Sequence, residues 1–195
     1  MTDENRWNHN IHYHPLVLAS VQDGARTALD VGCGEGMLTR ALRRKVPEVV
    51  GLDLDEPSVE LARGFKDDIS YVVGDVLTHD FPAGFDFIAS VATVHHMDAE
   101  AALTRLRTLL RPGGRLVIIG CARFEWRGLP FELAGVVAHR VYKRTRSHWE
   151  HPSPTVWPPP ETYSGMRSLA TRLLPGAKYR RHALWRYSLT WAKPN

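Results

Sequence analysis

Short apolar runs alternate with amphipathic stretches as far as residue 122, and this alternation constrains the fold more than any other feature of the sequence. The apolar runs occupy residues 25–32, 48–54, 69–75, 85–94 and 115–122. Stretches with apolar residues at helical spacing occupy residues 36–46, 57–65 and 99–114. Buried strands joined by amphipathic helices predict a parallel sheet covered on both faces, with right-handed crossovers.

The segments on either side of this core follow other patterns. Before it, residues 15–21 predict a short helix that opens with a proline. After it, residues 131–146 and 161–174 predict helices, and the proline-rich residues 151–160 predict an extended or irregular segment. Residues 177–194 have apolar side chains in alternation, which predicts two closing strands that need not be parallel.

Size and cysteine content restrict the class of protein. With 195 residues, the chain is expected to form one domain. Its two cysteines make no disulfide framework, which fits a reducing compartment. The polar residues 1–10 lack the apolar region of a signal peptide, and no apolar run approaches the roughly 18–20 residues that span a bilayer. We therefore expect a cytoplasmic protein with no membrane contact.

Charge is unevenly distributed along the chain. Residues 1–100 hold 8 Lys and Arg against 17 Asp and Glu, whereas residues 101–195 hold 17 against 4. Such asymmetry can mark an anionic partner such as a nucleic acid. The alternative is that the two halves face each other or the solvent.

A glycine-rich string, D-V-G-C-G-E-G, lies between the first predicted strand and the first helix after it. Gly32, Gly34 and Gly36 let the chain turn tightly and let a ligand approach the backbone. The amides at the start of the following helix have no partner within it. Because parallel sheets bind nucleotide-like ligands at the carboxyl ends of their strands, the string predicts such a site.

The spacing of these glycines excludes one family and favours another. A dinucleotide-binding G-x-G-x-x-G fails, because Met37 stands where the third glycine belongs. The string resembles motif I of the class I S-adenosylmethionine-dependent methyltransferases, D/E-x-G-x-G-x-G, at all four defining positions. Four more ordered matches follow up to about residue 120: G-x-D-x-x-P, G-D-V, FDFIASVATVHHM and LLRPGGRLVII.

The resemblance implies a fold, a cofactor and a set of contacts. The fold is a doubly wound α/β sheet of seven strands, mainly parallel with an antiparallel last strand, and helices on both faces. The cofactor is S-adenosyl-L-methionine. Its contacts in the glycine string would come from Asp30, Gly32, Cys33 and Gly34, with Cys33 as a small residue between glycines.

Asp53 is the expected ligand of the cofactor's ribose. It ends the second apolar run, 21 residues after Gly32, near the interval at which a carboxylate meets ribose hydroxyls in this topology. A carboxylate can accept two hydrogen bonds from a vicinal diol. Asp55 competes for this role, but the G-x-D-x-x-P match favours Asp53, with Leu54 beside it.

The third and fourth matches concern two more carboxylates. The resemblance implies that Asp75 contacts the adenine amino group and that the Val76 amide faces a ring nitrogen. An Asp after a strand is also an ordinary helix cap, so this alternative stays open. Asp86, at the start of the fourth run, is expected to be structural.

His95 and His96 are the candidate catalytic residues. They follow the fourth run in V-H-H-M, which resembles small-molecule methyltransferases that place histidine in the acceptor pocket. An ordinary histidine pKa of about 6.5 suits a general base at neutral pH. Packing or a structural hydrogen bond is the alternative for each, and adjacent residues are expected to point apart. The ten histidines lack the spacing of metal ligands, so no metal site is predicted.

Acceptor recognition is expected from residues 7–20 and 123–160. These segments hold aromatic side chains that suit an apolar or aromatic small molecule. The candidates there are Tyr13, His14, Phe124, Trp126, Phe131, Tyr142, Trp149 and Trp157.

The sequence thus predicts a single methyltransferase domain over residues 1–195 that transfers a methyl group to a small-molecule acceptor by in-line displacement. Residues 23–122 would bind the cofactor, residues 123–160 would recognise the acceptor, and residues 161–195 would close the sheet. One alternative is methylation of RNA or protein through the basic half, although the fourth strand lacks the N/D-P-P-Y/F motif used for planar amino targets. A non-catalytic protein that binds S-adenosylmethionine is the other. Oligomeric state is left open.

Overall fold

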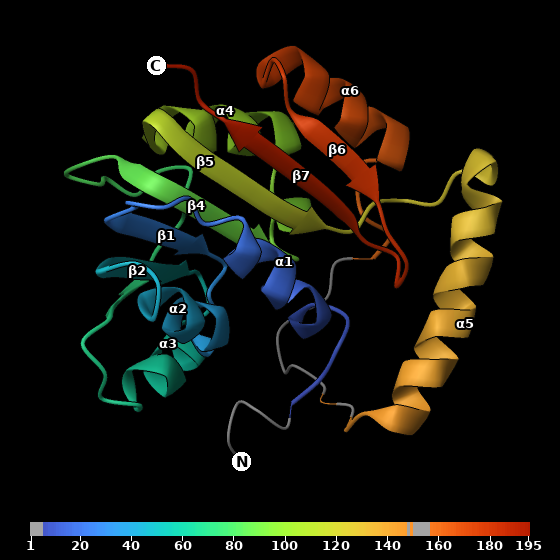
Figure 1. Cartoon of the computed structure of the whole chain (residues 1–195), viewed down its shortest axis with the longest axis horizontal. Coiled ribbons are helices and arrows are strands. Elements are labelled where there is room, and N and C mark those ends of the chain that lie inside the picture. The colour runs from blue at the N-terminus through green and yellow to red at the C-terminus, as the bar shows by residue number, and fades with distance from the viewer. Residues whose placement is uncertain (1–5, 148, 150–156) are drawn as a thin grey trace.

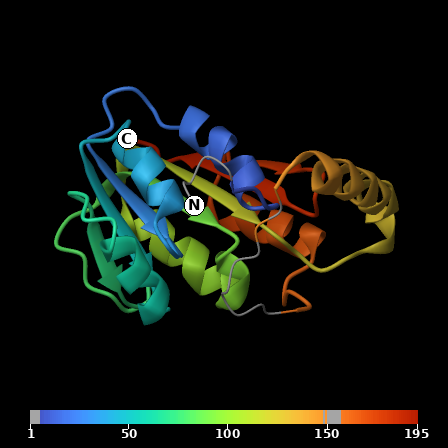
Figure 2. The same cartoon turned by 90° about the horizontal axis from the view of Figure 1, so that it is seen from below.

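The computed structural model describes residues 6–147, 149 and 157–195 and forms a layered α/β molecule (Figures 1 and 2). Its strands are β1 (Thr27–Val31), β2 (Glu48–Asp53), β3 (Ser70–Val73), β4 (Phe85–Val91), β5 (Leu110–Gly120), β6 (Lys178–Arg181) and β7 (Tyr187–Ala192). Its α-helices are α1 (His14–Ala19), α2 (Met37–Arg43), α3 (Glu56–Arg63), α4 (Ala99–Leu109), α5 (Leu129–Thr145) and α6 (Tyr163–Leu173). Short 3₁₀ turns are η2 (Ile11–Tyr13), η3 (Val94–His96) and η4 (Trp126–Gly128).

The strands form one sheet in the order β3-β2-β1-β4-β5-β7-β6. Strands β1 to β5 pair in parallel, whereas β7 runs antiparallel to both of its neighbours. The predicted seven-stranded, mainly parallel sheet with an antiparallel last strand is confirmed. Since the order reverses at β1 and β4, the carboxyl ends of these strands diverge there and leave a crevice.

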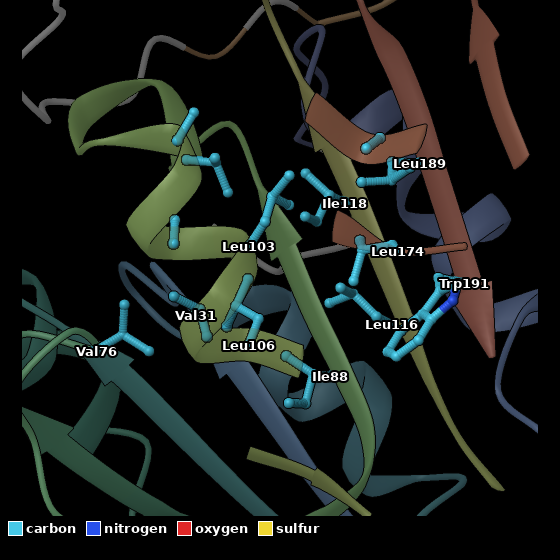
Figure 3. Close-up of a cluster of buried hydrophobic side chains, with 14 of the residues drawn as sticks. Val31, Val76, Ile88, Leu103, Leu106, Leu116, Ile118, Leu174, Leu189 and Trp191 are labelled. Atoms are coloured by element: carbon cyan, nitrogen blue, oxygen red, sulfur yellow. The ribbon is translucent and has the colours of Figure 1, made fainter. Parts of the chain in front are cut away.

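Alternating side chains of the strands supply two apolar layers. Leu29 and Val31 on β1 pack in one cluster with residues of α4 and α6, and Figure 3 labels Val31 together with Leu103 and Leu106 of α4. Ala28, between them, packs in the other cluster with residues of α1 and α2. Burying a Leu or Ile side chain fully contributes about 1.5–3 kcal/mol, so these layers fix which face each helix covers.

Two element boundaries differ from those expected. Helix α4 ends at Leu109 rather than at the Pro-Gly-Gly turn, because Leu110 is already extended, with φ −79° and ψ 134°, and pairs with Phe85. Proline disfavours helical geometry in the residue before it, so the chain could not continue the helix up to Pro112. Strand β4 ends at Val91 instead of continuing to residue 94, because Ala92 has a positive φ of 55°.

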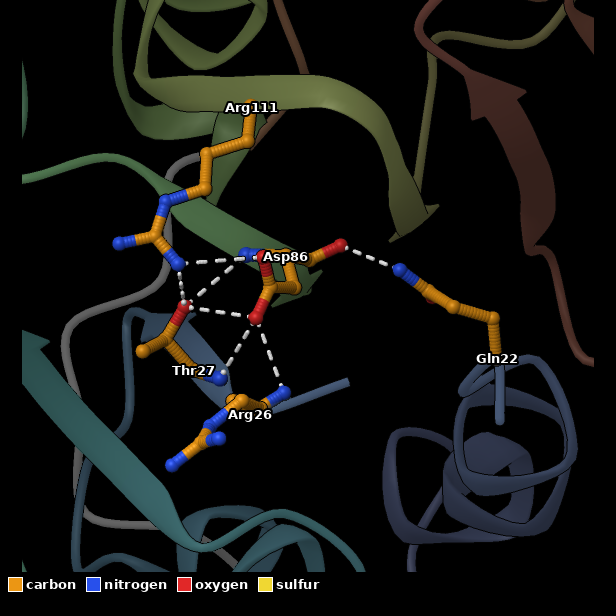
Figure 4. Close-up of polar contacts among 5 residues, drawn as sticks. All are labelled: Gln22, Arg26, Thr27, Asp86 and Arg111. Carbon is orange, nitrogen blue, oxygen red and sulfur yellow. Dashed lines mark hydrogen bonds and ion pairs between the residues drawn. The ribbon is translucent and has the colours of Figure 1, made fainter. Parts of the chain in front are cut away.

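Asp86 ties the amino ends of three strands together, at the end of the sheet away from the crevice (Figure 4). Its Oδ2 accepts hydrogen bonds from the backbone N–H groups of Arg26 and Thr27 at 2.9 and 3.0 Å, and Arg111 lies 3.2 Å from Oδ1. Although burial works to raise the pKa of Asp86, these donors hold it below its ordinary value. The expected structural role of Asp86 is confirmed.

The acidic first half and the basic second half contact each other. Asp86 pairs with Arg111, and Glu100 pairs with Arg172 at 2.7 Å. The expectation that the halves face each other therefore accounts for part of the charge asymmetry.

Helix α5 stands away from the sheet in Figure 1 and leaves apolar side chains in the solvent. Leu133, Val137 and Val141 lie one or two turns apart along it, and each is more than half exposed.

The extended or irregular segment predicted for residues 151–160, after α5, lies mostly outside the described residues. Its described part, residues 157–160, contains no helix or strand. Within the part of the chain that the structure describes, no helix is long and apolar enough to cross a membrane.

Candidate active site

A cavity of about 680 Å³ opens at the carboxyl ends of the parallel strands. All ten residues predicted to bind the cofactor or take part in catalysis line it. Segments far apart in the sequence close it: the stretch before α1, the loops after β1, β2, β3 and β4, and the start of β7. The site therefore lies at the place where a sheet of this order binds ligands.

The glycine loop after β1 needs its lack of side chains. Gly32 has a φ of 76°, and a Cβ there would overlap the side chain of Thr93, which follows β4. The loop is anchored to β2, because the amides of Gly32 and Cys33 both donate to the Leu52 carbonyl, at 2.8 and 3.1 Å. Only bare backbone can therefore occupy the space between β1 and β4.

Cys33 lies at the cavity through its backbone, while its thiol packs inward. The side chain belongs to a small apolar cluster with Val59, Ala62 and Tyr71. Burial raises the pKa of the Cys33 thiol, so it stays protonated. This packing fits the expected role of a small residue between two glycines.

Asp30 is a carboxylate almost without contact with water, at 1% exposure. Its Oδ2 accepts a hydrogen bond of 2.7 Å from the Thr39 hydroxyl. Burial raises the pKa of Asp30 to about 7, since desolvation penalises the charged form more than the Thr39 hydrogen bond favours it. No ion pair joins it to a Lys, Arg or His in the described residues, so a cation entering the cavity would be its charge partner.

Asp53 and Asp55 divide the roles that the sequence left in competition. Asp53 faces the glycine loop, accepting from the Gly34 amide at 2.7 Å through Oδ2 and from the Asp55 amide at 2.9 Å through Oδ1. The Asp55 carboxylate caps α3 instead, accepting from the Ser58 amide at 3.1 Å. Leu54, 66% exposed, lies at the cavity between them.

Asp75 and Val76 lie beyond β3 at the same cavity. The Asp75 carboxylate accepts from the Leu77 amide at 2.9 Å within a turn, and because no helix begins in this described segment, this contact is not the helix cap held open as an alternative. Asp75 also lines the cavity. Val76 is buried at 2% exposure.

His95 and His96 differ in burial although they are neighbours in η3. His95 is 9% exposed and its Nδ1 has no hydrogen-bond partner among the described residues, whereas His96 is exposed. Their rings lie 4.1 Å apart at 42°, so the two side chains do not point apart as expected. Burial, His96 and Arg186 together lower the pKa of His95 to about 4.

Two polar residues of the cavity wall, Asn10 and Arg186, were not among the candidates taken from the sequence. Arg6 also lines the cavity and pairs with Glu35 of the glycine loop at 2.7 Å. His14, one of the aromatic candidates for acceptor recognition, lines the cavity as well. Nothing local in the sequence marks Arg186, because its place at the cavity depends on the pairing of β7 with β5.

The aromatic candidates for acceptor recognition separate into two groups. His14, Trp149 and Trp157 line the cavity. The others do not line it, because Tyr13 is buried against the β6–β7 hairpin and Tyr142 stacks on Trp7. Phe124, Trp126 and Phe131 are exposed around the start of α5.

The sequence of this chain is similar to those of known methyltransferases. A family model described as "Methyltransferase domain" matches residues 29–118. The chain is 40% identical over 192 residues, 96% of this chain and 98% of the other, to a protein of Mycobacterium tuberculosis (strain ATCC 25618 / H37Rv) named "Uncharacterized methyltransferase Rv0089". This chain belongs to the methyltransferase family. The methyltransferase is also 32% identical over 98 residues, 47% of this chain and 40% of the other, to a "Ubiquinone biosynthesis O-methyltransferase" of Idiomarina loihiensis.

A solved structure supports the fold of this methyltransferase. The N-methyltransferase NodS from Bradyrhizobium japonicum WM9, in complex with S-adenosyl-l-homocysteine, matches it with a TM-score of 0.61 at 16% identity. The match covers 95% of this chain and 86% of that one. The methyltransferase uses S-adenosylmethionine, as its family does.

The cavity of the methyltransferase fits this cofactor on two observations. The loop at Gly32 has no room for a Cβ, which leaves bare backbone at the cavity wall. The buried Asp30 offers negative charge to a ligand that carries a sulfonium and an ammonium group. The volume also lies within the roughly 300–1,000 Å³ typical of small-ligand sites.

Proposed function

We propose that this methyltransferase acts on a small-molecule acceptor, with the ten cavity residues in the roles inferred from the sequence. The observation that carries the proposal is the single cavity that these residues share. It extends beyond the carboxylates of β1, β2 and the β3 loop to the ends of β4, β5 and β7, which leaves a region for a second ligand. Cys121, directly after β5, lines that region, and the cavity wall also includes Trp149 and Trp157, which suit an acceptor with an apolar or aromatic part.

The cofactor residues hold and orient in this scheme. Asp53 would accept from the ribose hydroxyls, Asp30 would pair with the charged amino group, and Asp75 would accept from the adenine amino group. Gly32 and Gly34 supply the close backbone wall. S-adenosylmethionine, when bound, supplies a methyl group already activated by its positive sulfur.

The acceptor side must position a nucleophile and handle its proton. Holding the nucleophile in line can supply about 7–11 kcal/mol through positioning alone. For a neutral hydroxyl acceptor, we assign the base to His95, which is neutral at physiological pH because its pKa is low. Nδ1 of His95 is inaccessible, so the ring would take the proton at Nε2. His96, exposed beside it, is the alternative base.

Calorimetry tests the cofactor part of the proposal. We expect S-adenosylmethionine to bind and nicotinamide dinucleotides not to bind. D53A should weaken binding by at least tenfold, because two hydrogen bonds to a charged oxygen pair are lost. D55A is the matched control: it should lower the melting temperature through loss of the α3 cap and change affinity little. Equal affinity of D53A and the wild type would contradict the ribose assignment.

A panel of phenols, amines and carboxylates tests the acceptor. Production of S-adenosylhomocysteine from one of these classes would support the proposal and identify the acceptor chemistry. Cofactor binding without turnover on any class, but with turnover on RNA or protein, would replace the small-molecule proposal.

A second candidate function is methylation of a group carried on an anionic macromolecule. The observation that favours it is α5, where Arg140 and Lys143 are exposed beside the apolar side chains that α5 leaves in solvent. Salt titration of binding to mixed RNA and DNA separates the candidates, because phosphate contacts make affinity fall steeply with salt. Weak binding with no salt dependence would remove this candidate.

A further inference from the structure

Arg186, which no carboxylate in the described part of the chain pairs with, lines the cavity next to β7. Arg186 directly precedes β7, and its Nε and Nη2 donate to the Asn10 side-chain oxygen at 3.1 and 2.7 Å. Its Nη1 donates to the backbone carbonyls of Leu184 and Trp185 at 3.4 and 3.2 Å. All of these acceptors are neutral, and no described carboxylate forms an ion pair with Arg186.

The other arginine in the cavity wall shows the contrast. Arg6 is paired with Glu35 at 2.7 Å, with both side chains mostly buried. Arg186 is also partly buried, yet its hydrogen-bond acceptors among the described residues are all neutral. A guanidinium removed from water is stabilised best by an anion, with which it can form two charge-assisted hydrogen bonds. The second N–H of Nη2 has no acceptor among the described residues and is available for such a bond.

The position of Arg186 separates it from the cofactor residues. Asp53 ends β2 and Arg186 directly precedes β7, and these two strands are four steps apart in the sheet order. At roughly 4.8 Å between neighbouring strands, that separation approaches 19 Å. Between them lie the ends of β4 and β5, where His95 is close enough to Arg186 for the positive charge to affect its protonation. Arg186 thus belongs to the acceptor end of the cavity.

We propose that Arg186 binds an anionic group, a carboxylate or a phosphate, on the methyl acceptor. This inference rests on the proposed function and adds a charge requirement to it. Asn10 then acts as a positioning residue, because its side-chain oxygen holds two nitrogens of the guanidinium. An acceptor would reach the methyl group with its nucleophile while its anionic group stays at β7.

The experiment compares matched acids and neutral isosteres on protein saturated with S-adenosylhomocysteine. The probes are benzoate against benzamide, octanoate against octanamide, and inorganic phosphate, with affinities from calorimetry. We expect the wild type to bind one of the acids about tenfold more tightly than its amide, the size of one hydrogen-bonded charge interaction. A phosphate acceptor would instead give binding of inorganic phosphate at the same site. Equal binding of acid and amide, with no phosphate binding, would overturn the inference.

Variants assign the preference to Arg186. R186Q should bring acid and amide within twofold of each other, or abolish phosphate binding, and leave the affinity for S-adenosylhomocysteine unchanged. R180Q is the matched control, since it removes an exposed charge from neighbouring β6 outside the cavity and should keep the preference. A purely structural tie to Asn10 would lower the melting temperature of R186Q without changing the ratio, which would contradict the proposal.

Two further outcomes are separable. If R186Q weakens S-adenosylhomocysteine by the same factor as the acid, Arg186 serves the cofactor and the inference is wrong, while the proposed function stands. If the wild type binds no S-adenosylhomocysteine, the proposed function itself fails. Should R186Q not fold, R186K decides: it keeps the charge but loses the planar fork, so the acid preference should fall at least threefold. An unchanged preference in R186K would then overturn the assignment.

Discussion

The carboxyl group of Asp30 should lose its proton when the cofactor binds. The carboxyl group is buried beside the glycine loop, with a pKa of about 7 and the Thr39 hydroxyl as its hydrogen-bond donor. Near neutral pH the protonated and the ionised form of Asp30 are therefore both populated. A cation in the cavity favours the charged form, so cofactor binding and ionisation of Asp30 are thermodynamically linked.

We predict that the affinity for S-adenosylmethionine rises as the pH increases from about 6 to 8, because Asp30 ionises over that range. The raised pKa also means that the ligand-free protein loses stability as the pH rises from about 4, where the unfolded chain ionises, to about 7, since ionisation of the buried group opposes folding. D30N should bind the cofactor more weakly, with no rise between pH 6 and 8, and should melt at a higher temperature than the wild type at pH 8. Calorimetry and thermal denaturation at several pH values check this, and a pH-dependent affinity retained in D30N would refute it.

His95 gives the second prediction at this scale. An ordinary histidine base loses activity as the pH falls through about 6.5. Because the pKa of His95 is lowered to about 4, its ring stays neutral in more acidic solution. With an acceptor from the panel and saturating cofactor, we expect kcat to hold down to about pH 5. H95Q should lower kcat by about 10²–10⁴ if the acceptor needs a base, and H96Q should change it little. Equal losses in both variants would move the base assignment to the pair.

How far single residues could be predicted depended on whether their role is local. The spacing of a short motif favoured Asp53 over Asp55 as the ribose ligand. In the structure Asp55 caps α3, and Asp53 accepts a hydrogen bond from the glycine loop. Arg186 could not be found in the same way. It reaches the cavity through strand pairing between segments more than sixty residues apart, and no pattern around the start of β7 distinguishes it from the other arginines nearby.

At the scale of elements, Asp86 joins three strands where their chains enter the sheet. Its carboxylate accepts from Arg26 and Thr27 before and within β1, and it pairs with Arg111 in β5 (Figure 4). These contacts fix the stagger of β1, β4 and β5 at the end away from the cavity. The opposite ends of the same strands carry the glycine loop and the histidines, so this contact sets their alignment.

We predict that D86N destabilises the protein by about 1.5–3 kcal/mol at pH 7, because hydrogen bonds and an ion pair to a charged acceptor are lost. The folded-state pKa of Asp86 is lowered, so its stabilisation is present above the unfolded-state value and is lost as the pH falls through the folded-state value. The difference between D86N and the wild type should therefore shrink below about pH 4. Urea denaturation measures it, with the exposed D68N as a control of smaller effect. A pH-independent difference would contradict the electrostatic explanation.

The elements themselves were largely predictable because their signals are periodic. Apolar runs and helical spacing located the parallel strands and their helices, and errors arose only where local geometry overrode the pattern. Ala92 ends β4 with a positive φ, which alanine seldom adopts and which no sequence pattern marks. Leu110 leaves the helical pattern of α4 although its apolar side chain continues it, since pairing with Phe85 makes it part of β5.

At the scale of the whole molecule, β7 holds the C-terminal part of the sheet together. It pairs with β5 over six residue pairs and with β6 over four, and both Leu189 and Trp191 are buried in the main apolar cluster. The order of strands along the chain and their order in space differ here, because β7 lies between β5 and β6.

We predict that a chain shortened to residues 1–186 does not fold, because it loses the buried side chains of β7, leaves β6 without a partner strand and leaves one edge of β5 unpaired. A chain shortened to residues 1–193 keeps the contacts of Lys193 with Arg107 and Leu110 and should fold normally. Circular dichroism and gel filtration distinguish a folded chain from an unfolded or aggregated one. A cooperative thermal transition in the 1–186 chain would show that β7 is dispensable.

The place of β7 also orders events during synthesis. Strand β6 leaves the ribosome before the strand it pairs with has been made, and β5 must wait with one edge open until residues 187–192 emerge. The wall that carries Arg186 arrives last, together with the strand that completes the sheet. Since a chain without β7 is not expected to fold, binding of the methyl donor should begin only after residues 187–192 have left the ribosome.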